Sequence, residues 1–148
     1  MVLIAKTAIF IYFLLPNNKQ IGMILVTGGA GFIGSNIVEA LITDGYDIFV
    51  IDDMSTGSLN NLKDVEAKTE RRGYFNDKFL ISKKLSDALK AVPKPDVIVH
   101  YGIPSSSPMY KANHSLVGSA INDFISVLDF ANETGAKVIY ASSSSVYN

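Results

Sequence analysis

The residues best suited to chemistry are three glycines spaced three apart, Gly28, Gly31 and Gly34, between an apolar run and a segment of helical periodicity. The first glycine permits a tight turn, the second lets the backbone approach a pyrophosphate, and the third lets the helix pack on the strand. The helix would present free N–H groups and the positive end of its dipole to the phosphates. The spacing therefore predicts a dinucleotide-binding turn; the alternative is a structural glycine turn that binds no nucleotide.

Two acids follow the second apolar run: Asp52, which lies 18 residues beyond Gly34, and Asp53. A carboxylate at this place can accept both adenosine-ribose hydroxyls and would repel a 2′-phosphate. No Arg occurs in residues 52–62, so we predict NAD rather than NADP as the cofactor. We assign Asp52 to the ribose and Asp53 to the neighbourhood of the adenine; the alternative is that both acids are simply solvated.

The elements that must position these residues alternate between strands and helices along the chain. The apolar runs of the strands are continuous, as in strands that are covered on both faces. This pattern predicts an α/β fold with a doubly wound parallel sheet of the Rossmann type, in strand order 3-2-1-4-5, truncated after the fifth strand. The expected strands are residues 23–27, 46–51, 78–82, 96–100 and 137–141, the expected helices are residues 35–43, 62–72, 86–92 and 116–134, and the expected loops include 54–61 and 104–108.

The composition excludes several classes of protein. The 148 residues contain no Cys, which excludes a disulfide scaffold, a thiolate zinc site and a Cys nucleophile. With 13 basic and 14 acidic residues the net charge is −1, which argues against nucleic acid as a partner. The two histidines, His100 and His114, have no carboxylates at a regular ligand spacing, so we predict no metal site.

Residues 1–22 differ from the rest, since 14 of them are apolar and Lys6 and Lys19 are their only charges. A membrane-spanning helix needs about 20 apolar residues, which this segment does not reach. We interpret residues 1–22 as a non-essential N-terminal extension, with Met23 as the natural start of a domain that covers residues 23–148. The alternatives are weak membrane association through residues 1–15, a signal-like segment, or an element packed on the domain.

Four segments together resemble the NAD-dependent epimerase/dehydratase family of extended short-chain dehydrogenases/reductases, typified by UDP-glucose 4-epimerase. They are Thr-Gly-Gly-Ala-Gly-Phe-Ile-Gly (27–34), Ile-Asp-Asp-Met-Ser-Thr-Gly (51–57), Asp-Val-Ile-Val-His-Tyr-Gly (96–102) and Tyr-Ala-Ser-Ser-Ser-Ser-Val-Tyr (140–147). The segments occur in the family's order. The resemblance identifies the chain as an N-terminal fragment of such a protein, without its substrate domain.

The resemblance implies NAD as cofactor and a nucleoside-diphosphate sugar as substrate of the intact parent. Such a parent oxidises a sugar hydroxyl by hydride transfer to NAD and then reduces the keto intermediate again. In this chain, Ser143 would hydrogen-bond the reacting hydroxyl, and Phe32 and Ile33 would join the glycines at the cofactor. Tyr101 and Gly102 would contact the cofactor through backbone atoms. The resemblance also implies a cytoplasmic protein and a homodimeric parent.

The family's general base is a Tyr with a Lys four residues later, which should follow Ser143. The chain contains one such pair, Tyr74 and Lys78, and it lies before the fourth strand. We interpret this pair as a coincidence and predict that the 148-residue chain does not turn over a sugar substrate. The alternatives are a non-catalytic NAD-binding module, or another nucleotide-sugar dehydratase or reductase of the same family.

Overall fold

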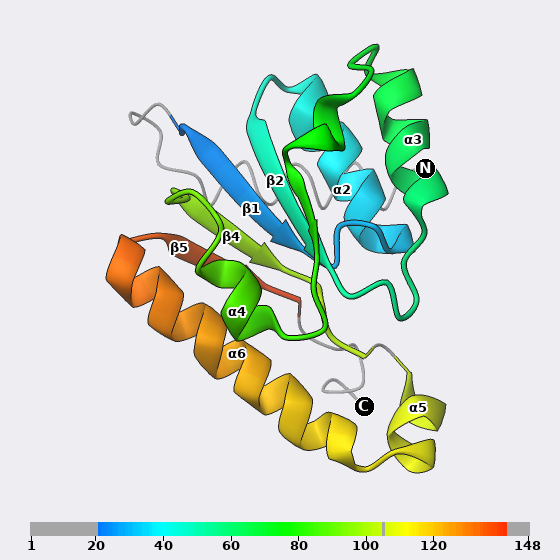
Figure 1. The fold of residues 1–148 in the computed structure, drawn as a ribbon, viewed down its shortest axis with the longest axis vertical. Helices are drawn as coiled ribbons and strands as arrows, with labels where there is room; N and C mark the ends of the chain where they lie inside the picture. Colours follow the sequence, from blue (N-terminus) through cyan, green and yellow to red (C-terminus); the bar gives the residue numbers. More distant parts are fainter. Residues whose placement is uncertain (1–20, 105, 142–148) are drawn as a thin grey trace.

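The computed structural model describes residues 21–104 and 106–141, which form a sheet of five parallel strands in the order β3-β2-β1-β4-β5 (Figure 1). This confirms the predicted α/β fold and the predicted strand order. The strands are β1 (Met23–Thr27), β2 (Asp47–Asp52), β3 (Phe79–Ile81), β4 (Val97–His100) and β5 (Lys137–Tyr140).

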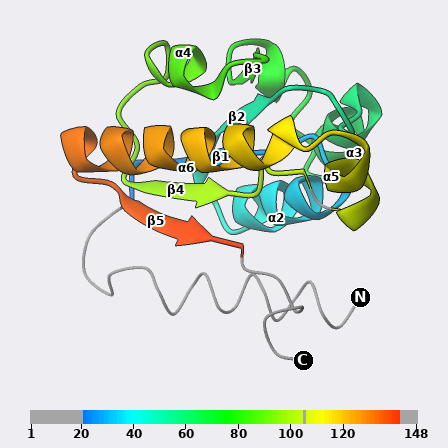
Figure 2. The same cartoon turned by 90° about the horizontal axis from the view of Figure 1, so that it is seen from below.

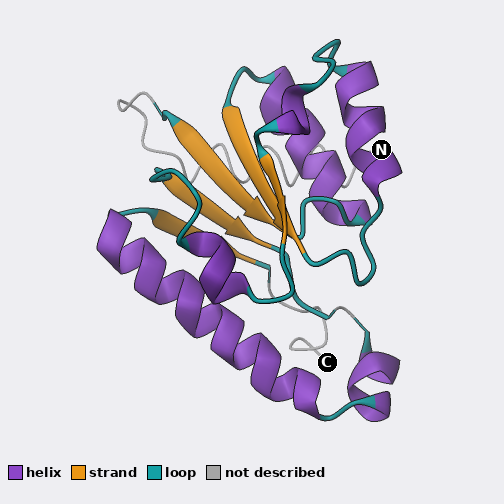
Figure 3. Cartoon of the chain, in the orientation of Figure 1, coloured by secondary structure: helices purple, strands orange, loops and turns teal. Residues whose placement is uncertain are grey.

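Helices connect the strands, as the secondary-structure colours of Figure 3 show. The helix α2 begins three residues earlier than predicted, because Gly31 is its N-cap and Gly34 lies inside its first turn. The helix α3 also begins early, since the Ser58 side chain accepts a hydrogen bond from the N–H of Asn60. The helices are α2 (Phe32–Thr43), α3 (Leu59–Lys68), α4 (Leu85–Leu89), α5 (Ser107–Ala112) and α6 (Ser115–Thr134), with a 3-10 turn η1 (Tyr74–Asn76). The last residues of the predicted loops 54–61 and 104–108 therefore belong to α3 and α5 in the structure.

One face of the sheet is covered by α2 and α3. Side chains that alternate along the strands, such as Ile24, Val26 and Val50, pack there against Ile37 and Val65. Burying these side chains stabilises the fold by roughly 25 cal/mol for each Å² of apolar surface that is removed from water. This core holds α2, and therefore the glycine turn before it, firmly on the sheet.

The opposite face is covered by α4 and α6 (Figure 2). Leu25 and Ile98 of the sheet pack there with Leu89 of α4 and Val127 of α6. The outer side of α6 is different, because it exposes large apolar side chains. These are Val117, Ile121, Ile125 and Leu128, which are 44% to 56% exposed.

The parallel register brings the ends of the central strands to one edge. Thr27 of β1 lies opposite Ile51 of β2 on one side and opposite His100 of β4 on the other. The chain leaves β1 toward β2 and leaves β4 toward β5, so the strand order reverses between β1 and β4. Ligands of open α/β sheets bind outside the carboxyl ends of the strands at such a reversal.

Candidate functional site

The glycine turn lies at this edge and fits closely against its own backbone. Gly28 has a φ of +71°, a left-handed conformation that favours glycine, and its N–H donates to the carbonyl of Ile51 at 2.7 Å. A Cβ on Gly34 would lie 2.1 Å from the carbonyl oxygen of Gly28. The shape of the turn therefore requires glycine at both positions.

The N-terminus of α2 opens toward the solvent beside this turn. Its N-cap, Gly31, has no side chain to accept a hydrogen bond, and the first turn of the helix contains no acidic residue. The first N–H groups of a helix have no partner inside the helix. Phe32 and Ile33, in this first turn, are 78% and 58% exposed. The arrangement leaves backbone donors and apolar surface available to an anionic ligand with an apolar part.

Asp52 ends β2 next to the turn and is only 6% exposed. Its Oδ2 accepts a hydrogen bond from the N–H of Ala30 at 2.9 Å, and its Oδ1 accepts from the N–H of Met54 at 2.8 Å. The first bond ties the carboxylate to the glycine turn. The second holds Met54 at a φ of 59°, a conformation that non-glycine residues adopt rarely. Asp52 therefore shapes two loops, a role that the sequence reasoning missed.

The loop between β2 and α3 packs on the same turn. The N–H of Ser58 and the side-chain amide of Asn61 both donate to the carbonyl of Ala30, at 3.0 and 2.8 Å. A Cβ on Gly57 would meet the Asp52 carboxylate at 2.7 Å, so this position also favours glycine. The turn is thus held at the start of the segment 51–57 and by residues 58 and 61, just beyond its end.

The exit of β4 forms the other wall. The N–H of Tyr101 donates to the Thr27 carbonyl at 3.1 Å, and the N–H of Gly102 donates to the Thr27 hydroxyl at 3.1 Å. A Cβ on Gly28 would lie 2.7 Å from the nitrogen of Gly102. Burial raises the pKa of Tyr101, so its half-buried phenol stays neutral. The structure therefore brings Tyr101 and Gly102 into backbone contact with the glycine turn.

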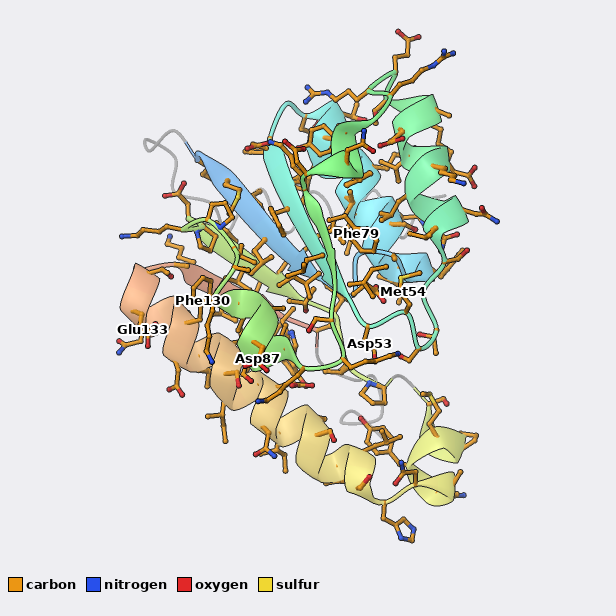
Figure 4. The ribbon with its side chains drawn as sticks, viewed as in Figure 1. Asp53, Met54, Phe79, Asp87, Phe130 and Glu133 are labelled. Atoms are coloured by element: carbon orange, nitrogen blue, oxygen red, sulfur yellow. The ribbon has the colours of Figure 1, made fainter. Side chains whose placement is uncertain are left out.

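Asp53 and its neighbours form the end of the site that lies toward β3. Asp53 is exposed, and its Oδ1 accepts from the N–H and the hydroxyl of Ser55 at 2.8 and 2.6 Å. The ammonium group of Lys83, after β3, donates to the Asp53 carbonyl. Burial, and secondarily the charge of Asp53, raises the pKa of Asp123 on α6. Figure 4 shows Asp53 beside Met54 where β2 leaves the sheet. Sequence reasoning missed Lys83 and Asp123, because nothing local in the sequence connects them to Asp53.

The pair Tyr74 and Lys78 lies at the opposite end of the sheet. The Tyr74 hydroxyl accepts from the N–H of Ile48 at 2.7 Å and donates to the Asp47 carboxylate at 3.0 Å, and Lys78 forms an ion pair with Asp47. Burial, with the nearby Asp47 carboxylate, raises the pKa of Tyr74 to about 12. A general base needs a lowered pKa. This geometry agrees with the interpretation of the pair as a coincidence.

The predicted residue Ser143 lies outside the described residues. Within residues 21–104 and 106–141, no group of three or more His, Asp or Glu side chains is arranged to hold a metal ion. Within the same ranges, no helix has both the length and the apolar character that crossing a membrane requires.

The fold and this edge define a Rossmann-type domain with a glycine turn at the reversal of the strand order. The model of the NAD dependent epimerase/dehydratase family matches residues 24–148. The chain belongs to this family.

Its relatives share both sequence and fold. A UDP-glucuronic acid decarboxylase 1 from Danio rerio is 33% identical over 133 residues, which are 88% of this chain and 29% of that protein. A UDP-glucose 4-epimerase from Lactobacillus helveticus is 33% identical over 127 residues, or 84% of this chain and 36% of that protein. The structure of a UDP-glucose 4-epimerase from Thermotoga maritima with UDP-glucose is 27% identical with a TM-score of 0.69, and the match covers 82% of this chain and 38% of that one. The chain thus spans about a third of the length of these curated relatives.

Proposed function

We propose that this chain binds NAD at the carboxyl ends of β1, β2 and β4, as the cofactor-binding portion of a nucleotide-sugar epimerase. The observation that carries the proposal is the uncapped N-terminus of α2, held by the glycine turn at the point where the strand order reverses. The close packing of Gly28 and Gly34 against neighbouring backbone holds this helix end in place, and its free N–H groups suit a pyrophosphate. We propose the domain boundary at Met23, where β1 begins.

Each residue of the edge has a proposed part in holding the cofactor. Gly28, Gly31, Phe32, Ile33 and Gly34 would contact the pyrophosphate through backbone atoms. Asp52 would accept the hydroxyls of the adenosine ribose, because each of its oxygens has a lone pair beyond the one used by the backbone. Asp53 would lie near the adenine, and the backbone of Tyr101 and Gly102 would contact the nicotinamide half.

When bound, NAD supplies a hydride acceptor for a carbon that carries a sugar hydroxyl. The residues of this chain would orient the cofactor and the sugar relative to each other. We propose that Ser143 hydrogen-bonds the reacting hydroxyl of a nucleoside-diphosphate sugar. The relatives include a decarboxylase and an epimerase at the same 33% identity, so a decarboxylase or another dehydratase or reductase is the second candidate.

Calorimetric titration of the 148-residue chain with NAD and with NADP tests cofactor binding. We expect saturable binding of NAD and weaker binding of NADP, because the 2′-phosphate would approach Asp52. NAD at 100 times its Kd should stabilise the fold by about 2.7 kcal/mol, which a melting experiment detects. Absence of both heat and a melting shift would contradict the proposal.

We further propose that the chain binds NAD without turning over a sugar nucleotide, as a binding module would. Its described Tyr-x-x-x-Lys pair, Tyr74 and Lys78, is engaged with Asp47 at the other end of the sheet. Chromatography of UDP-galactose, UDP-glucose and UDP-glucuronate incubated with the chain and NAD checks this. Formation of any interconverted or decarboxylated sugar nucleotide would show that the chain is catalytic.

A homodimeric parent is the assembly that we propose, with the outer side of α6 in the interface. Val117, Ile121, Ile125 and Leu128 form an apolar stripe there, and such a stripe is normally covered. Light scattering should find a dimer of the chain. Ile121→Glu should give monomers, whereas Asn122→Glu, one position away, should not. A monomer at every concentration would contradict this interface.

We propose a cytoplasmic location, with weak membrane association through residues 1–15 as the alternative. Vesicle flotation of the chain with and without residues 1–22 separates the two. Equal recovery in the unbound fraction supports the cytoplasmic location, and flotation of the longer chain alone supports the alternative.

A further inference from the structure

A row of side chains crosses the carboxyl ends of three strands beneath α6. Thr27 of β1, His100 of β4 and Tyr140 of β5 lie opposite one another in the parallel register. His100 is completely buried, and its ring stacks with Phe124 of α6 at 6.1 Å and with Tyr140 at 5.8 Å between ring centroids. These aromatic contacts fix the plane of the imidazole ring. Only its two nitrogens can form hydrogen bonds.

The Thr27 hydroxyl connects His100 to the candidate site. Its Oγ1 lies 2.6 Å from Nδ1 of His100 and accepts a hydrogen bond from the N–H of Gly102 at 3.1 Å. Thr27 is 1% exposed, so its own O–H needs an acceptor within the protein. Nδ1 of His100 is the acceptor that lies in reach.

This requirement selects one tautomer of the imidazole. If Nδ1 is the acceptor, the proton sits on Nε2, which has no hydrogen-bond partner among the described residues, and one buried polar atom is unsatisfied. If Nδ1 carried the proton, both Nε2 and the Thr27 O–H would lack partners. The first arrangement is favoured because each unsatisfied buried group is costly. Burial lowers the pKa of His100 to about 4, so the ring is neutral at pH 7 and can accept.

We propose that His100 is a positioning residue for the proposed cofactor site. Its Nδ1 accepts the Thr27 O–H and so turns a lone pair of that hydroxyl toward the N–H of Gly102. This keeps the exit of β4 in the backbone contact with Gly28 described above. The inference rests on the proposed function for its link to NAD, but the hydrogen-bond chain exists without the cofactor.

Nuclear magnetic resonance of the ¹⁵N-labelled chain without NAD tests the hydrogen-bond chain first. We expect the His100 ring nitrogens to report an unprotonated Nδ1 and a protonated Nε2 at pH 7. Hydrogen exchange at the Gly102 amide should be about tenfold faster in His100→Phe, which keeps a ring but removes the acceptor. His100→Asn, which can present an oxygen near the Nδ1 position, should restore exchange to within about threefold of the parent chain.

Calorimetry with NAD then tests the effect on the site. His100→Phe should weaken NAD binding about tenfold, and His100→Asn should recover most of it, a rescue that simple filling of the core would not produce. If His100→Phe does not fold, the same measurements are made on Thr27→Val and Thr27→Ser, because Val lacks the hydroxyl and Ser keeps it.

Three results would overturn the proposal. They are a proton on Nδ1, Gly102 exchange that His100→Phe and Thr27→Val leave unchanged, and NAD affinity that those variants leave unchanged. If the parent chain binds no NAD, the proposed function fails, whereas the tautomer and the Gly102 exchange still decide whether His100 orients Thr27.

Discussion

The two ends of the sheet hold polar groups in opposite ways. At the amino end of β2, Tyr74, Asp47 and Lys78 satisfy one another and the N–H of Ile48. At the carboxyl end, the N-terminus of α2 has no side-chain cap, and Phe32 is 78% exposed. A group of reactive residue types can therefore be a closed structural cluster, while a turn of glycines and backbone N–H groups remains open to a ligand.

In one respect the two ends are alike, because at each end burial holds a side chain in its neutral form. Burial and Asp47 raise the pKa of Tyr74 to about 12, which fixes the phenol as a hydrogen-bond donor. Burial lowers the pKa of His100 to about 4, which fixes the imidazole as neutral. At neutral pH both groups are therefore neutral, and neither pKa lies near 7, where a general acid or base works best.

The largest effect should come from disrupting the glycine turn at the open end. In Gly34→Ala the new Cβ would lie 2.1 Å from the Gly28 carbonyl, so the turn must move. We expect a loss of about 3 kcal/mol in the free energy of unfolding and no measurable NAD binding. Urea denaturation and calorimetry measure the two quantities.

The matched control is Gly118→Ala on the exposed part of α6, where a Cβ would meet nothing within 4 Å. It should stabilise the chain by about 0.5–1 kcal/mol, because Ala favours the helix interior, and leave NAD affinity unchanged. Equal behaviour of the two variants would break the comparison between the ends of the sheet.

Acid should weaken the carboxyl end through His100. The pKa of His100 is about 4 in the folded chain against an ordinary value of 6.5, so between these values the unfolded chain binds the additional proton. The free energy of unfolding contributed by His100 is therefore complete above pH 6.5 and falls as the pH drops, by about 3 kcal/mol near pH 4. Urea denaturation from pH 7.5 to 4.5, compared with His100→Asn, measures this slope. Identical slopes in both proteins would refute the assignment.

Asp52 and Asp53 provide a matched pair of neighbours. Asp52→Asn would place an amide donor against the N–H of Ala30 or Met54, so we expect a loss of about 2 kcal/mol in stability and a smaller preference for NAD over NADP. Asp53→Asn, on an exposed side chain, should cost less than about 0.5 kcal/mol. Denaturation and the ratio of the two cofactor affinities check this. A larger change in the cofactor preference at Asp53 than at Asp52 would mean that Asp53 binds the ribose.

Local patterns were sufficient to predict most of the fold. The run from Met23 to Thr27 is apolar and ends in glycine, and the predicted strand 23–27 agrees with β1 residue by residue. The start of α2 was predicted three residues late because Gly34 reads as a helix breaker, although here it lies in the first turn. The start of α3 depends on the cap at Ser58, a single hydrogen bond within a segment that reads as a loop.

The contacts that join distant segments could not be predicted. The Thr27–His100 bond joins residues 73 apart, and the Ala30–Asp52 bond joins residues 22 apart. The first pair follows from the register of β1 and β4, and the second from the way the turn after β1 packs on the end of β2; neither is visible in residues that are neighbours in the sequence. The one available signal was that Thr27 and His100 each end a strand beside the predicted reversal of strand order.

A change at the closed end of the sheet should have little effect on NAD binding. Tyr74→Phe removes the hydroxyl that bridges the N–H of Ile48 and the Asp47 carboxylate, and we expect a loss of about 1 kcal/mol in the free energy of unfolding. NAD affinity should stay within about twofold of the parent chain, because additivity holds for distant sites. Paired denaturation and calorimetry measure both. A fall in NAD affinity without loss of stability would mean that the two ends are coupled, and the division into a closed end and an open end would then be wrong.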